Sequence, residues 1–185
     1  MQTTSKPGGW RLRDVILLTL IGIFFGFIFW AWAFVYNAIA ATPLKPFAND
    51  ITIGAWLMAG PMAGFLLRKA GATTLGEVFA AVAEMAIGSQ WGASTILSGI
   101  IQGIGSELGF AFTGYKAWNR FGLFLSTLTS TIVTFAWDLY ANGYGSYHLG
   151  MLLTLLIIRF ISIGFFCGIL VDAITHLINK AGILK

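Results

Sequence analysis

The sequence predicts an all-α integral membrane protein, a bundle of six transmembrane helices. Hydrophobic residues make up 57% of its 185 residues and charged residues only 10%, whereas soluble globular domains carry about 25% charged residues. The apolar residues gather in six stretches. Most of these approach the roughly 20 residues that a helix needs to cross a bilayer core of about 30 Å.

The six stretches define the expected organisation of the chain. Six spans leave no room for a separate soluble domain, so we expect a single membrane domain over residues 1–185. The expected spans cover residues 15–36, 51–67, 74–88, 93–112, 121–140 and 149–177.

Each span has a local justification. The first follows basic residues, as a signal peptide would, but its apolar run is longer than the 7–15 residues or so of a signal core, so we expect a retained helix. Gly60-Pro61 predicts a kink in the second span. The third is the weakest, because Glu77 and Glu84 interrupt it. A short turn at 89–92 precedes the fourth, and a loop rich in glycine and aromatic residues, 141–148, joins the fifth to the sixth.

The distribution of basic residues predicts the orientation in the membrane. Lys and Arg near the ends of spans stay on the cytoplasmic side. If successive spans cross the membrane in opposite directions, all the basic residues that flank the six spans lie on one side, except Lys45. We therefore expect both termini in the cytoplasm and a multi-pass protein of the plasma membrane, whose basic character needs no nucleic acid to explain it. The residues that share the cytoplasmic side are Lys6, Arg11, Arg13, Arg68, Lys69, Lys116, Arg120, Lys180 and Lys185.

Three pairs of glycines spaced four apart predict close helix packing. They are Gly22 with Gly26, Gly60 with Gly64, and Gly99 with Gly103. We expect packing within the chain; the alternative is that one of these surfaces binds a helix of a partner.

Charged side chains at membrane depth are costly, so each one present calls for a reason. Counting about 1.5 Å per residue places Glu107 and Arg159 at similar depth, which predicts a structural ion pair between them. Glu84, near the outer end of its span, has no basic residue predicted at its level. It suits a cationic or amino-bearing ligand, although solvation at a helix end would explain it equally well.

Aromatic and polar residues gather at the same outer level as Glu84. Aromatic faces attract flat cations, and the outer face holds more aromatic residues than the inner one. We therefore expect an outward-facing pocket for a small, flat, positively charged or nitrogen-rich molecule. Its candidate residues are Glu84, the possible stacking partners Trp91, Tyr36, Trp137 and Tyr144, and the polar Asn37, Gln90, Asp138 and His148.

The sequence contains neither the GxxxxGK[ST] phosphate loop nor the HExxH zinc motif. We expect no catalytic site, no metal site and no cofactor, so uphill transport would need a coupled ion or a second protein.

The sequence resembles the substrate-binding S components of energy-coupling factor (ECF) vitamin transporters, and more narrowly the YkoE type. The segments AEM at 83–85, GSQWG at 88–92 and DLYANG at 138–143 carry this resemblance. It implies an S-component fold that captures thiamine or its hydroxymethylpyrimidine (HMP) precursor outside the cell. Uptake would then be driven by a transmembrane coupling subunit and ATPase subunits, which alone use ATP.

The resemblance also suggests roles and leaves alternatives open. Glu84 would bind the aminopyrimidine. Many S components dock their coupling subunit through an AxxxA motif on the first helix, where this sequence offers Gly22 and Gly26. The alternatives are an S component for another vitamin such as riboflavin, an intramembrane enzyme that uses Glu107 and Arg159, and a scaffold subunit without a ligand.

Overall fold

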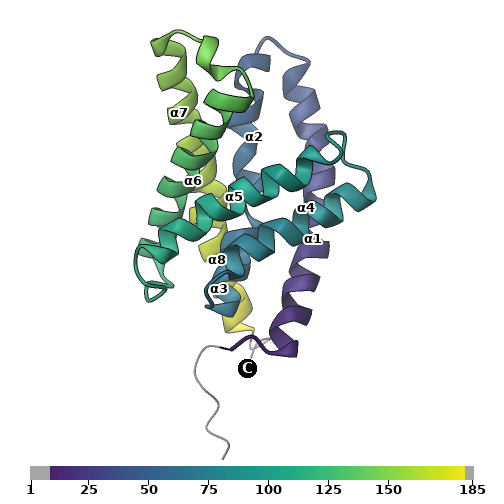
Figure 1. Ribbon diagram of the computed structural model, residues 1–185, viewed down its shortest axis with the longest axis vertical. Helices are drawn as coiled ribbons and strands as arrows, with labels where there is room; N and C mark the ends of the chain where they lie inside the picture. The colour runs from purple at the N-terminus through teal and green to yellow at the C-terminus, as the bar shows by residue number, and fades with distance from the viewer. Residues whose placement is uncertain (1–8, 182–185) are drawn as a thin grey trace, which may run out of the picture.

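The computed structural model describes residues 9–181, and every regular element in that part of the chain is helical (Figure 1). Lys6 and Lys185 lie outside the described residues. The α-helices are α1 (Leu12–Ala40), α2 (Ala48–Trp56), α3 (Ala59–Leu67), α4 (Ala72–Ile87), α5 (Ser94–Ala111), α6 (Arg120–Ala141), α7 (Leu149–Ile163) and α8 (Val171–Lys180). Two short 3₁₀ helices, η1 (Lys45–Phe47) and η2 (Tyr144–Ser146), follow α1 and α6, and a π-helical segment, η3 (Gly164–Leu170), joins α7 to α8.

The second expected span is divided into α2 and α3, so the predicted kink is confirmed. The break falls at residues 57–58 because Pro61 has no N–H to offer the carbonyl four residues earlier. The break also frees the N–H of Gly60. The Glu77 carboxylate of α4 accepts this N–H at 2.7 Å, which gives a polar residue of the third span a structural partner.

Four helical segments of the described chain are long and apolar enough to cross a membrane, namely Leu12–Ala40, Lys45–Leu67, Arg120–Ala141 and Leu149–Ile178. The expected third and fourth spans, α4 and α5, are not among them. Helix α4 has only 16 residues, and Gln102 and Glu107 interrupt the apolar sequence of α5. Both run obliquely across the bundle in Figure 1, beside the steeper α1.

The first glycine pair lets α1 and α4 pack at close range. Gly22 and Gly26 are buried, and a Cβ atom at Gly26 would lie 2.5 Å from Ala83 Cβ and 2.9 Å from the backbone nitrogen of Glu84. The expected packing within the chain is therefore confirmed for this pair. The surface considered for a coupling subunit is instead occupied by α4, and this contact sets the position of Glu84.

The two ends of the bundle differ in charge. Helix α1 begins, α3 ends, α6 begins and α8 ends at the lower end of the molecule in Figure 1, here called the basic end. These helix ends carry Arg11 and Arg13, Arg68 and Lys69, Arg120, and Lys180. The opposite end holds η1, with Lys45, and η2.

Candidate binding site

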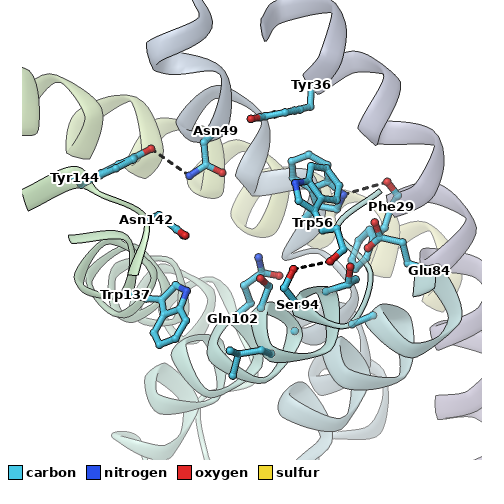
Figure 2. A pocket seen from close by; sticks show the side chains of 16 residues that line it. Phe29, Tyr36, Asn49, Trp56, Glu84, Ser94, Gln102, Trp137, Asn142 and Tyr144 are labelled. Atoms are coloured by element: carbon cyan, nitrogen blue, oxygen red, sulfur yellow. Dashed lines mark hydrogen bonds between the residues drawn. The ribbon is translucent and has the colours of Figure 1, made fainter. Parts of the chain in front are cut away.

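A cavity of about 400 Å³ lies between the helices, and part of its lining comes from η2, which is at the end opposite the basic end. Residues from α1, α2, α4, α5, α6 and the turns beside them line it (Figure 2). They are Phe29, Tyr36, Asn49, Trp56, Ala81, Glu84, Trp91, Ser94, Thr95, Leu97, Ser98, Gly99, Gln102, Trp137, Asn142 and Tyr144. Five of the nine predicted site residues are therefore brought to one cavity: Tyr36, Glu84, Trp91, Trp137 and Tyr144.

Glu84 is the only acidic residue among those that line this cavity. It lies in the last turn of α4 and is 3% exposed. Its Oε1 accepts a hydrogen bond from Ser89 Oγ at 3.1 Å, and no salt bridge joins Glu84 to any described residue. A buried carboxylate without a cationic partner is costly, so the cavity is suited to a ligand that brings a positive charge or N–H donors.

Three aromatic rings form the wall beside Glu84. Trp91 meets Trp56 edge to face, with ring centroids 5.2 Å apart, and also contacts Tyr36 at 5.6 Å. The indole Nε1 of Trp56 donates to the Phe29 carbonyl at 3.1 Å, which fixes that ring in the orientation seen in Figure 2. This wall therefore presents rigid aromatic surface to a flat ligand, and the rings can also stabilise a cation.

The opposite wall is polar. Asn49 at the start of α2, Asn142 after α6 and Tyr144 in η2 lie together there, with Trp137 nearby (Figure 2). Tyr144 Oη donates to Asp50 Oδ2 at 2.6 Å and accepts from Asn49 Nδ2 at 3.2 Å. Burial, with a further contribution from the Asp50 carboxylate, raises the pKa of Tyr144, so this phenol remains a donor at neutral pH.

Behind the polar wall lies a buried charged cluster formed by Arg159, Asp50 and Asp138. The Arg159 guanidinium donates from Nε to Asp50 Oδ1 at 2.6 Å, from Nη1 to Thr134 Oγ1 at 3.3 Å, and from Nη2 to Asp138 Oδ2. Arg159 and Asp50 are fully buried. The ion pair predicted between Arg159 and Glu107 is therefore wrong.

Glu107 has a different structural role near the basic end. Its carboxylate accepts the backbone N–H groups of Gly71 at 2.7 Å and Thr74 at 3.0 Å, so it caps the start of α4 from the neighbouring α5. Depth counting failed because it treated α5 as upright. The helix runs obliquely (Figure 1), and Glu107 binds the start of α4 whereas Arg159 binds Asp50 and Asp138.

Four predicted site residues do not line the cavity. Asn37 Nδ2 donates to Gln90 Oε1 at 2.9 Å, which ties the end of α1 to the turn that carries Trp91. His148 caps α7, where its Nδ1 accepts from Met151 N at 3.2 Å. Asp138 lines a smaller polar recess of about 80 Å³ that shares part of its wall with the cavity.

Several residues that shape the site are absent from the nine candidates. Trp56 and Asn142 belong to the aromatic and polar residues at the outer level from which the sequence predicts the pocket, but they are not among those nine. Asn49 and Asp50 lie outside the expected spans, between the span that ends at residue 36 and the one that begins at residue 51. The start of α2 at Ala48 turns both into helical residues that face α6 and α7; no local signal in the sequence indicated this.

Comparisons with known proteins agree with this architecture. Residues 13–133 match the family described as ABC-type cobalt transport system, permease component. A Bacillus subtilis (strain 168) protein named as an HMP/thiamine permease, YkoE, is 31% identical over 176 residues, which cover 95% of this chain and 88% of that protein. A crystal structure of an S component of an ECF transporter superposes with a TM-score of 0.89 at 30% identity, covering 95% of this chain and 89% of the other.

These matches extend over nearly the whole chain, and they confirm the resemblance carried by residues 83–85, 88–92 and 138–143. They also place the chain among substrate-binding transport components rather than enzymes. The chain belongs to this permease family, and it is a YkoE-type S component of the ECF transporter class and a multi-pass plasma membrane protein.

Proposed function

We propose that this S component captures thiamine or its HMP precursor at the outer face of the membrane. The observation that carries the proposal is Glu84, a buried carboxylate without a salt bridge, beside the rings of Trp56, Trp91 and Tyr36 in one cavity. An aminopyrimidine can donate to such a carboxylate. The thiazolium ring of thiamine is a flat cation that suits aromatic faces.

The outward position of the cavity rests on charge asymmetry. The basic end faces the cytoplasm under the positive-inside rule, which places both termini inside and the cavity near the outer surface. In this proposal α4 and α5 complete six spans. Their oblique path within the bundle and the backbone capping by Glu77 and Glu107 support this, because polar groups at membrane depth need internal partners.

The printed name of the YkoE relative, HMP/thiamine permease, supports the choice of ligand. As an S component, the chain would deliver its ligand to a transmembrane coupling subunit powered by ATPase subunits. ATP would be used only by those partners, and this chain would need no cofactor of its own. The polar residues that complete the ligand site are proposed to be Asn49, Asn142 and Tyr144, with Gln102 from α5.

Calorimetric titration of the purified protein with thiamine and HMP tests this function. Replacing Glu84 with Gln should weaken binding at least about tenfold, equivalent to about 1.4 kcal/mol. Glu107→Gln is the matched control, because it removes a carboxylate from α5 outside the cavity, and we expect it to leave affinity unchanged.

Two results would contradict the proposal. Unchanged affinity in Glu84→Gln would remove Glu84 from the site. Tight binding of riboflavin with no binding of thiamine or HMP would assign the cavity to a different vitamin, and mass spectrometry of the molecule that co-purifies with the protein would identify it.

A further inference from the structure

We propose that the cavity accepts thiamine, whose side chain ends in a free alcohol, and rejects the phosphate ester of the same molecule. The inference deepens the proposed function and rests on it. It concerns the small polar recess beside the cavity, formed by Asn49, Ser98, Gln102, Thr134, Trp137, Asp138 and Asn142 with Ile53 and Ile101.

Asp138 fixes the orientation of two amides at the mouth of this recess. Asn49 Nδ2 donates to Asp138 Oδ2 at 3.0 Å, and Asn142 Nδ2 donates to Asp138 Oδ1 at 2.5 Å. Because the N–H₂ groups of both amides point to this carboxylate, their carbonyl oxygens remain free to face the cavity, as Figure 2 shows. These two amides therefore offer carbonyl oxygens as hydrogen-bond acceptors, which suit a donor on the ligand.

Arg159 lies close behind this wall, but each of its three nitrogens already donates to a neighbouring side chain, so it is not available as an anion-binding group. Nε, Nη1 and Nη2 point to Asp50, Thr134 and Asp138 respectively, and the side chain is 0% exposed. Turning it toward a ligand would leave two buried carboxylates without their cation, at a large energetic cost. Arg159 is thus a positioning residue for the carboxylates and not a phosphate ligand.

The net charge near the recess is also unfavourable for an anion. Two carboxylates, Asp50 and Asp138, face one guanidinium, which leaves one net negative charge. None of the described residues that line the cavity or the recess is Lys, Arg or His. A phosphate monoester carries a charge of about −1.5 to −2 at pH 7, so placing it here sets like charges together in a partly desolvated site.

An alcohol satisfies the same wall. With the aminopyrimidine of thiamine at Glu84, the hydroxyethyl group at the far end of the molecule is directed across the cavity toward Asn49 and Asn142. Its hydroxyl can donate to an amide carbonyl and accept from the uncommitted Gln102 or Ser98, for which the described residues show no hydrogen bond. Thiamine ends in such a hydroxyl, and its phosphate ester lacks this donor.

The test is calorimetric titration of the wild-type protein with thiamine and thiamine monophosphate. The ester should bind at least about thirtyfold more weakly than the alcohol. Affinities of alcohol and ester within threefold of each other would overturn the inference. If neither thiamine nor HMP binds, the proposed function itself fails, and that result is distinct from equal binding of thiamine and its monophosphate.

Two variants locate the discrimination at the recess. Asp138→Asn removes the net negative charge and frees both amides to turn, so the ratio of ester to alcohol affinity should rise at least about tenfold. Asn142→Lys adds a cation at the mouth of the recess and should also raise the ratio of ester to alcohol affinity. Because Asn142 is exposed, this variant keeps the test available if Asp138→Asn does not fold. Ser146→Lys is the matched control, since it adds the same charge to the same loop outside the cavity lining. An equal rise in Ser146→Lys, or no rise in Asn142→Lys, would refute the assignment to the recess.

Discussion

Arg159 on α7 and Asp50 on α2 form a salt bridge of 2.6 Å in which neither side chain is exposed. The bridge ties two helices that are more than 100 residues apart in sequence. Asp50 also accepts from Tyr144, and the adjacent Asn49 lines the cavity. The charged cluster thus holds the polar wall of the site in place from behind.

We expect Arg159→Ala to destabilise the protein strongly. It leaves Asp50 and Asp138 buried without their cation, and breaking a buried ion pair in this way costs about 3–5 kcal/mol. Arg120→Ala is the matched control, because Arg120 is 88% exposed in its bridge to Asp172, and exposed pairs contribute about 1 kcal/mol or less. Thermal unfolding in detergent measures both, and similar midpoints for the two variants would contradict the structural role of the cluster.

Gly26→Val should disturb both stability and ligand affinity. A Cβ atom at this position lies within 2.9 Å of the backbone nitrogen of Glu84, so α1 and α4 must move apart at a cost of about 1–3 kcal/mol. Thermal unfolding and thiamine titration should both report the change. Gly164→Ala serves for comparison, since its Cβ meets only Thr127 at 3.7 Å, an ordinary contact. A stable Gly26→Val protein with unaltered thiamine affinity would show that this contact does not position Glu84.

Removing the Glu77 side chain should destabilise the break between α2 and α3. In Glu77→Ala the buried N–H of Gly60 loses its acceptor, and an unsatisfied buried donor costs about 1–3 kcal/mol. Glu77→Gln keeps an amide oxygen in place of Oε1 and should lose less stability in the same thermal unfolding assay. If the two variants are equally destabilised, the hydrogen bond to Gly60 is not what Glu77 contributes.

Trp91→Ala should lower thiamine affinity about two- to thirtyfold. The substitution removes a ring that meets both Trp56 and Tyr36, and a cation loses about 0.5–2 kcal/mol with each aromatic face. Phe34→Ala is a suitable reference, because Phe34 is 63% exposed on α1 and does not line the cavity. Calorimetry should show a loss confined to Trp91→Ala; an equal loss in both variants would point to a general effect of truncating aromatic residues.

Much of the site was predictable because it depends on local sequence. Glu84 and Trp91 are only seven residues apart, so any helix that ends near residue 88 brings both to the same rim. The kink at Gly60-Pro61 follows from the missing proline N–H, and the close approach at Gly22 and Gly26 follows from the absence of side chains. These features need no knowledge of which helices are neighbours.

The errors arose where a residue depends on a distant part of the chain. Depth counting paired Arg159 with Glu107, but the oblique path of α5 carries Glu107 to the start of α4, and α2 supplies Asp50 in its place. His148 was expected at the ligand, but the first turn of α7 uses it as a cap. In both cases several partners were chemically equivalent, and only the packing of the helices selected among them.

The sequence by itself determined that this chain is a membrane protein with a basic end, and it placed an acidic residue and aromatic rings at the other end. Those properties follow from composition and from short spacings along single helices. Only the tertiary structure decided that Asn49 and Asn142 share Asp138, and that Arg159 is enclosed by carboxylates. Groups on several helices together determine whether a cavity wall presents hydrogen-bond donors or acceptors. This property is therefore fixed only when those helices pack.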